Sequence, residues 1–282
     1  MKEIPAEQEA REFFQDATLM DNEFMGLCFE TRPECAQVAI RIILGAPDLV
    51  VQSVTTEKTY AHPAGRGIRT DIKATDTEGR HYAVEMQNSD DGLLALRASY
   101  YLATLRAASL AKNENFDKLP ETYVIFITRT DTFRKGRIIY RFERYDAEAD
   151  LLLGDKAHII FVNGEQRGTG SDMERFLHDV FCRSHEEMLI PELANAVRYL
   201  KTTEDGQKIM NEKAQKLLDA REAKGEAKGE ARGRMQTALR MLADGLALDK
   251  IAHYSGLALE EVRALAAEAS RKANSVPAAQ PA

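Results

Sequence analysis

A predicted β-hairpin at residues 69–87, RTDIKATDTEGRHYAVEMQ, constrains the fold of this chain more than any other segment. Its turn, Thr-Glu-Gly at 77–79, suits a three-residue loop in which glycine takes the left-handed position. Such a loop fixes the pairing of both strands and sets Asp71 directly opposite Glu85. The turn therefore decides which side chains the two strands present together.

The polar face of this hairpin brings two acids close together. Side chains alternate between the faces of a strand, so Asp71, Glu85 and Gln87 share one face, and apolar residues line the other. Directly paired Cβ atoms lie about 4.5–5.5 Å apart, and two carboxylates so close need a proton, a cationic neighbour or a metal ion. The alternative to a metal site is a surface ladder of charges in which Arg69 and Lys73 are the cations.

The donor atoms of the hairpin suit a hard cation. Oxygen ligands without a nearby histidine or cysteine favour Mg²⁺ or Mn²⁺ over zinc. The backbone carbonyl of Met86 could add an oxygen to those of Asp71 and Glu85. Such an ion could contact a scissile phosphate and lower the pKa of a bound water. The Gln87 amide could orient that water, because an amide both donates and accepts hydrogen bonds.

The order of predicted elements indicates an α/β fold. Strand-like runs lie at 49–56, 69–75, 81–87, 121–128, 138–144 and 157–163. Helical patterns cover 5–30, the segment from Pro33 to Gly45, 92–112 and most of the chain from 171 onward. We therefore expect a mixed central sheet flanked by helices within 1–210, followed by an α-helical C-terminal extension.

The extension is expected to have three parts. Residues 211–238 form a linker whose Lys/Arg-Gly-Glu-Ala repeat favours a solvated helix over a flexible tether, although each glycine costs about 1 kcal/mol in a helix. Residues 239–270 suggest a small helix-turn-helix-like module. Its second helix is acidic, which favours a role in packing or self-association over sequence-specific DNA binding. A homo-oligomer through these helices is therefore possible. Residues 271–282 are expected to be disordered.

Several ordered motifs resemble the PD-(D/E)XK nuclease superfamily, and more closely its family of transposases, which are related to the recombination-promoting nucleases. The motifs are the hairpin, RASYYLATL (97–105), VIFITRTDTFRKGRIIYRF (124–142) and IIFVNG (159–164). The resemblance covers roughly residues 15–210. It implies a PD-(D/E)XK (restriction-endonuclease-like) core that acts on DNA with Mg²⁺ or Mn²⁺.

The resemblance also implies roles for single residues. The Asp and the following acid of that superfamily bind the divalent ion, which points to Asp71 and Glu85. The residue two beyond the acid is usually lysine, whereas here it is Gln87, as in many transposase-like relatives. An acid on the first core helix often completes such sites, and Asp21 is the candidate, with Glu23 as runner-up.

DNA contacts are expected from Arg69, Lys73, Arg97 and Tyr101. Arg97 and Tyr101 are four residues apart and share one face of their predicted helix. They either contact phosphate and brace the site, or Tyr101 belongs to the core while Arg97 extends over it.

The composition limits the remaining choices. The net charge of −7 argues against a uniformly basic nucleic-acid binder, although basic residues outnumber acidic ones within 60–145. Three cysteines without a CxxC motif, a charged N-terminus and no long apolar run predict a cytoplasmic protein outside the membrane.

The leading hypothesis is a metal-dependent DNA endonuclease, transposase-associated or domesticated from a mobile element. The alternatives are an inactive nuclease-fold protein that binds nucleic acid or assembles, and an interaction protein without a nucleic-acid role.

Overall fold

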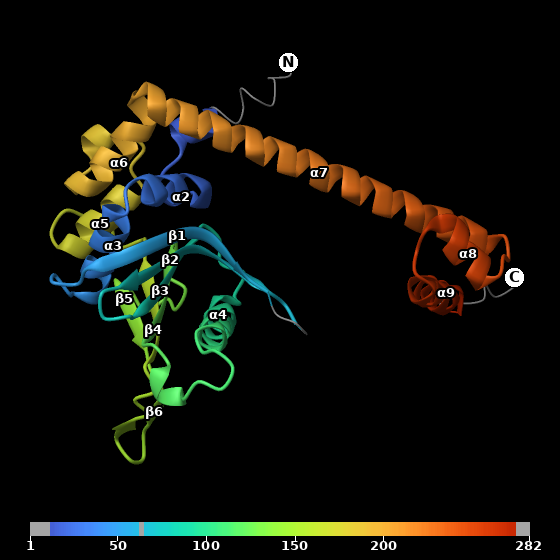
Figure 1. Ribbon diagram of the computed structural model, residues 1–282, viewed down its shortest axis with the longest axis horizontal. Coiled ribbons are helices and arrows are strands. Elements are labelled where there is room, and N and C mark those ends of the chain that lie inside the picture. The colour runs from blue at the N-terminus through green and yellow to red at the C-terminus, as the bar shows by residue number, and fades with distance from the viewer. Residues whose placement is uncertain (1–11, 62–64, 275–282) are drawn as a thin grey trace, which may run out of the picture. The chain divides into compact units, whose positions relative to one another are not determined.

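The computed structural model describes residues 12–61 and 65–274 of the chain (Figure 1). The chain forms two compact units, which divide between Ala214 and Gln215. The first unit contains the sheet and the hairpin, and the second is helical. No helix in the described part of the chain is long and apolar enough to span a membrane.

Six strands form one mixed sheet in the order β1-β2-β3-β4-β8-β5. Neighbours β3, β4 and β8 run parallel, whereas β1, β2 and β5 pair antiparallel with their neighbours. Another two short strands, β6 (Tyr145–Asp146) and β7 (Leu151–Leu152), form a separate hairpin that the sequence did not predict. The six strands are β1 (Val51–Tyr60), β2 (Ile68–Asp76), β3 (His81–Gln87), β4 (Thr122–Thr128), β5 (Ile139–Phe142) and β8 (Ala157–Asn163).

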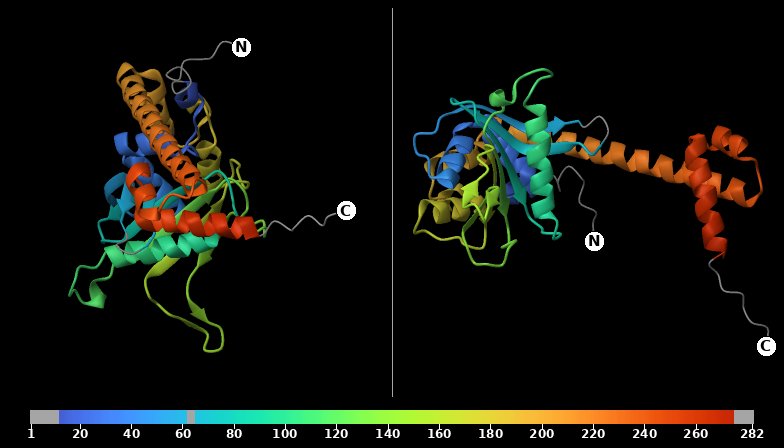
Figure 2. Two further views of the ribbon diagram at one scale, coloured as in Figure 1. Left: turned by 90° about the vertical axis from the view of Figure 1, so that its right-hand side faces the viewer. Right: turned by 90° about the horizontal axis from the view of Figure 1, so that it is seen from below.

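Helices cover both faces of the sheet, which confirms the predicted mixed α/β fold. Helix α4 lies on one face, and α2, α3, α5 and α6 lie on the other (Figure 1 and Figure 2). Short 3-10 helices occur at Phe116–Lys118 and His185–Glu187. The helices that cover the sheet are α2 (Asn22–Thr31), α3 (Glu34–Leu44), α4 (Leu94–Ala108), α5 (Asp172–Val180) and α6 (Pro191–Thr202).

The helix predicted over 5–30 is interrupted. Residues 12–16 are helical, and α2 begins only at Asn22, while residues 5–11 lie outside the described part. In the turn between them, the backbone N–H of Thr18 donates to the Asp21 carboxylate over 2.8 Å. This side-chain bond competes with the helical backbone bonds and separates the two helical segments.

The core beneath α4 explains the continuous apolar runs of the central strands. Ala98 and Leu102 of α4 pack against a buried cluster that includes Val124, Phe126 and Phe161 of β4 and β8. Strands in the middle of a parallel array are covered on both faces, so they carry apolar residues at successive positions.

The predicted hairpin register is confirmed. Strands β2 and β3 pair from Ile72–Val84 to Thr75–His81, and Gly79 has a left-handed φ of +78°. Buried Asp76 holds the turn: its carboxylate accepts from the Arg80 backbone N–H over 2.8 Å and from Arg80 Nε over 2.6 Å.

The second unit contains the end of α7 (Glu204–Ala243), α8 (Leu248–Ser255) and α9 (Leu259–Asn274). Residues 221–234 lie within α7 as exposed helix. The sequence predicted a disordered tail from residue 271, whereas residues 271–274 belong to α9. Residues 275–282 lie outside the described part. A small core lies in this unit, with Ala238, Ile251 and Val262 at its centre and Ala252, Leu257 and Leu265 packed against them.

Candidate active site

The backbone ladder of the hairpin opens where the two acids meet. Regular pairing of β2 with β3 ends at Ile72–Val84, one pair before Asp71 and Glu85. From that point on, side-chain carboxylates accept hydrogen bonds from the backbone N–H groups. The Asp71 N–H donates to Glu85 Oε1 over 3.2 Å, and the Met86 N–H donates to Asp71 Oδ2 over 2.9 Å. The two carboxylates therefore lie side by side and are fixed by each other's strand.

Both acids are buried, with 8% of Asp71 and 2% of Glu85 exposed. Burial raises the pKa of Asp71 to about 6, against the opposing effect of its hydrogen bond from Met86. Burial, and then the neighbouring charge of Asp71, raise the pKa of Glu85 well above its ordinary value. The site therefore disfavours two bare negative charges and favours a proton or a cation between them.

The structure does not contain the surface ladder of charges. Arg69 is exposed and pairs with Glu57 at 3.9 Å, while Lys73 Nζ lies 6.0 Å from the centre of the Tyr60 ring. Neither cation forms a hydrogen bond or ion pair with the two acids in the described part of the chain. Contact of Arg69 and Lys73 with DNA stays a prediction.

Helix α2 reaches the site through a residue that the sequence analysis missed. Asn22 Nδ2 donates to Asp71 Oδ1 over 3.1 Å. Asp21, the expected further ligand, instead accepts from Thr18, whereas the negative charge of Glu23 raises the pKa of Asp71. The group of this segment that contacts Asp71 is thus an amide that lies between two acids in the sequence, and its residue type alone gave no signal for it. A role of Asp21 or Glu23 as a metal ligand stays a prediction.

Two polar side chains of helix α4, Arg97 and Tyr101, contact the hairpin. Arg97 bridges two acceptors: Nη1 donates to Gln87 Oε1 over 2.8 Å, and Nη2 donates to Asp91 Oδ2 over 3.1 Å. Tyr101 packs against the core, and its hydroxyl donates to the Arg69 carbonyl over 3.3 Å. Burial, and then the charges of Glu85 and Asp71, raise the pKa of Tyr101.

The Met86 carbonyl faces the same space. The N–H and C=O of one strand residue point to the same side, and the Met86 N–H donates towards β2. Its carbonyl oxygen therefore points towards β2 as well. The carboxylates of Asp71 and Glu85 lie side by side, the Met86 carbonyl points towards the same strand, and oxygen donors of this kind suit a hard divalent ion.

A cavity of about 510 Å³ lies beside the site and is rich in arginine. Asn88, directly after β3, accepts from Arg129 Nε over 2.9 Å and donates to the Met20 carbonyl over 2.8 Å. Arg129 and Arg167 both lie over the Phe181 ring, at 5.1 and 4.2 Å from its centre. The sequence analysis did not single out these arginines, although both follow strands whose carboxyl ends meet at one edge. The cavity is lined by Glu12, Phe13, Asp16, Ala17, Thr18, Asp21, Arg129, Arg167, Phe181 and Arg183.

Comparison with known proteins identifies a family for this chain. The family model described as PD-(D/E)XK nuclease family transposase matches residues 48–219, which include the whole hairpin and α4 but not α2. No curated protein and no solved structure matches the chain.

Proposed function

Because the chain belongs to the PD-(D/E)XK nuclease family transposases, we propose that it is a divalent-metal-dependent DNA endonuclease. Membership of this family leads us to expect nuclease activity of the transposase type. Hydrolysis of a DNA phosphodiester is the specific reaction that we propose. The observation that carries this proposal is the pair of buried carboxylates at the opening of the hairpin. A transposase-associated origin, or domestication from a mobile element, agrees with the family.

The residues of the site suit the expected ion. PD-(D/E)XK nucleases generally use divalent metal ions. Asp71, Glu85 and the Met86 carbonyl would hold Mg²⁺ or Mn²⁺, and Glu23, rather than Asp21, is the acid of α2 that we assign to the same ion. When bound, such an ion polarises the scissile phosphate and lowers the pKa of an attacking water.

Gln87 and Arg97 would act as a pair. Arg97 donates to Gln87 Oε1, which leaves the Gln87 NH₂ group free to donate to water or phosphate. The guanidinium also supplies positive charge next to the position where the superfamily usually has lysine. Arg97 is therefore a positioning residue for Gln87, and Tyr101 and the exposed Arg69 are proposed to lie along the DNA path together with Lys73.

Nicking of supercoiled plasmid DNA by the full-length protein tests this function. We expect nicking with Mg²⁺ or Mn²⁺, none with a chelator, and a loss of at least about 100-fold in Asp71→Asn and Glu85→Gln, since both changes remove charge that holds the ion. Glu226→Gln, which changes an exposed acid of α7, is the matched control.

Full activity of the Asp71→Asn, Glu85→Gln double variant would reject this site. Gln87 in place of lysine supports a second candidate, an inactive nuclease-fold protein that binds nucleic acid. Tight binding of Mn²⁺ and DNA by the wild-type protein without any nicking would favour that second candidate.

A further inference from the structure

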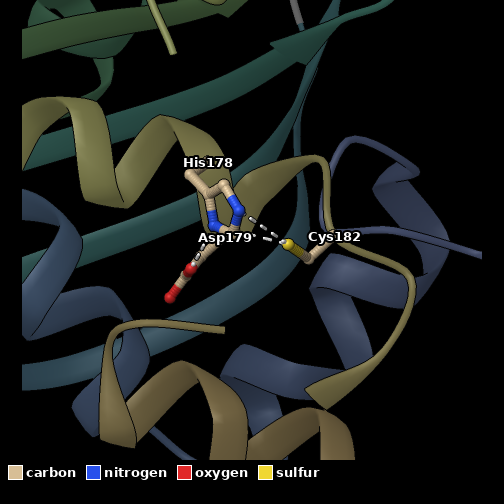
Figure 3. A group of neighbouring side chains, drawn as sticks. All are labelled: His178, Asp179 and Cys182. Carbon is tan, nitrogen blue, oxygen red and sulfur yellow. Dashed lines mark hydrogen bonds and ion pairs between the residues drawn. The ribbon is translucent and has the colours of Figure 1, made fainter. Parts of the chain in front are cut away.

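Three potential metal ligands of different chemistry meet at the end of α5, apart from the hairpin. His178 Nδ1 lies 3.1 Å from Asp179 Oδ1 and 3.4 Å from Cys182 Sγ, and the three ligand atoms lie within 4.8 Å of one another (Figure 3). In Figure 3 the imidazole lies between the carboxylate and the sulfur. The site proposed for the endonuclease uses none of these residues.

Asp179 is a fixed and fully buried member of this group. Its Oδ1 accepts from the Leu189 N–H over 2.8 Å, and its Oδ2 accepts from the Ile190 N–H over 2.7 Å, so it ties the end of α5 to the start of α6. Each carboxylate oxygen has two acceptor positions, which leaves Oδ1 able to bind a further group. Outer hydrogen bonds of this kind orient the carboxylates that ligate metals.

A proton on His178 Nδ1 cannot satisfy both of its contacts. Asp179 Oδ1 and Cys182 Sγ both approach the same nitrogen, Nδ1 of His178. One N–H can point at only one of them, whereas a cation among the three atoms attracts all of them. Buried ionised groups in proteins are usually paired or coordinate a metal.

The spacing resembles the edges of a zinc tetrahedron. Zinc bonds of about 2.0–2.3 Å to nitrogen, oxygen and sulfur imply a nitrogen–oxygen edge of about 3.3 Å and a nitrogen–sulfur edge of about 3.6 Å. The corresponding contacts of His178 are 3.1 and 3.4 Å, and the third edge, between Asp179 and Cys182, is at most 4.8 Å and would close by a side-chain shift on metal binding. Thiolate and imidazole favour Zn²⁺ over the hard Mg²⁺.

A nucleophilic cysteine is the main competing explanation. A Cys-His-Asp relay needs the thiol on one imidazole nitrogen and the acid on the other. Here both approach Nδ1, and Sγ lies 3.8 Å from Nε2.

We propose that His178, Asp179 and Cys182 bind one Zn²⁺, with a water molecule as the fourth ligand. The Cys182 thiol loses its proton to solvent as the zinc–sulfur bond forms. Water reaches the ion from the side of His178, whose side chain is 32% exposed, while Asp179 is fully buried. The ion stabilises the junction between α5 and α6, because Asp179 already holds the start of α6.

Zinc binding by the full-length protein tests the proposal. After metal is stripped with a chelator and Zn²⁺ is added back, elemental analysis of gel-filtered protein should give one zinc per chain. Replacement by Co²⁺ should give a thiolate-to-cobalt charge-transfer absorption band. Cys182→Ser and His178→Gln should each weaken Zn²⁺ affinity by at least about 100-fold, since loss of an outer partner alone costs 10–100-fold.

The controls separate this ion from the one in the hairpin. Cys28→Ala changes another buried thiol, and the Asp71→Asn, Glu85→Gln double variant changes the nuclease site, so both should retain the zinc and the cobalt band. Far-ultraviolet circular dichroism checks that each variant folds, and the wild-type cobalt spectrum tests sulfur ligation without any substitution. A wild-type protein that retains no zinc, a cobalt spectrum without the thiolate band, or equal zinc binding by folded Cys182→Ser would overturn the proposal.

Discussion

Asp71 and Glu85 set the pH dependence of stability at the scale of single residues. A carboxyl group whose pKa is raised by folding binds more protons in the native than in the unfolded state between its two pKa values. For Asp71 these values are 3.8 and about 6. The stability of the metal-free protein therefore falls as pH rises through this window and stays low above it. One pKa unit corresponds to about 1.4 kcal/mol, so the effect is on the order of 3 kcal/mol.

Neutralising one acid should stabilise the metal-free protein. Glu85→Gln keeps an oxygen that can accept from the Asp71 N–H but removes a buried charge, so we expect a higher melting temperature near pH 7.5 and a much smaller change near pH 4. Addition of Mg²⁺ should raise the melting temperature of the wild type but not that of Glu85→Gln. Differential scanning calorimetry measures both effects, and Glu226→Gln is the control. A lower metal-free melting temperature for Glu85→Gln near pH 7.5 would contradict this explanation.

Arg97 acts through Gln87, so its loss should affect turnover more than metal binding. Arg97→Met removes the bonds to Gln87 and Asp91 and leaves the Gln87 amide free to rotate. We expect kcat for nicking to fall roughly 10- to 100-fold, because a misplacement of about 1 Å can cost 100-fold. Mn²⁺ affinity, measured by calorimetry, should change little. Arg97→Lys should restore only part of the rate, since lysine cannot bridge two acceptors with a rigid fork. Unchanged kcat in Arg97→Met would exclude the positioning role.

At the scale of elements, the hairpin could be predicted because its determinants are local. Gly79 and the turn around it set the pairing of Asp71 with Glu85 without help from the rest of the chain. Asn22 could not be predicted, because its contact with Asp71 depends on how α2 packs beside β2. The sequence did not predict the break before α2, because no proline or glycine causes it. The break depends on the hydrogen bond from the Thr18 N–H to the Asp21 carboxylate.

Lys201 joins three segments that are distant in sequence. Its Nζ donates to the carbonyls of Gln15, Ala17 and Arg183 over 2.8, 2.7 and 2.8 Å. Lys201→Met removes these charge-assisted bonds, and we expect a loss on the order of 3 kcal/mol in the free energy of unfolding. Denaturant titration measures it, with the exposed Lys208→Met as the control. Equal stability of the two variants would show that Lys201 does not hold these segments together.

The glycines of α7 should weaken that helix. A Cβ atom built at Gly225, Gly229 or Gly233 meets nothing within 4 Å, so alanine fits at each position. The triple change to alanine should stabilise the helix by about 1 kcal/mol at each site, because alanine has less backbone entropy to lose. Amide hydrogen exchange of residues 221–234 should slow accordingly, while plasmid nicking remains at its wild-type rate. Faster exchange in the triple variant would mean that the glycines have a packing role.

At the scale of the whole molecule, a net charge of −7 makes DNA binding depend on local positive charge. We expect Arg129 and Arg167, which line the cavity beside the hairpin, to contact backbone phosphate. The Arg129→Gln, Arg167→Gln double variant should lower the slope of log K against log salt by about 2, since each phosphate contact contributes about 0.9. Fluorescence anisotropy at several salt concentrations measures the slope, and the exposed Arg198→Gln is the control. An unchanged slope in the double variant would place the DNA elsewhere.

The short turn at 77–79 also limits how this chain can evolve. A single residue inserted there would shift the register of β3 and turn Glu85 towards the opposite face, away from Asp71. The loops between the helices tolerate changes in length far better, because such loops run over the surface. A change of length in those loops would therefore alter substrate contacts without moving the two acids, whereas a change of length at 77–79 would separate them.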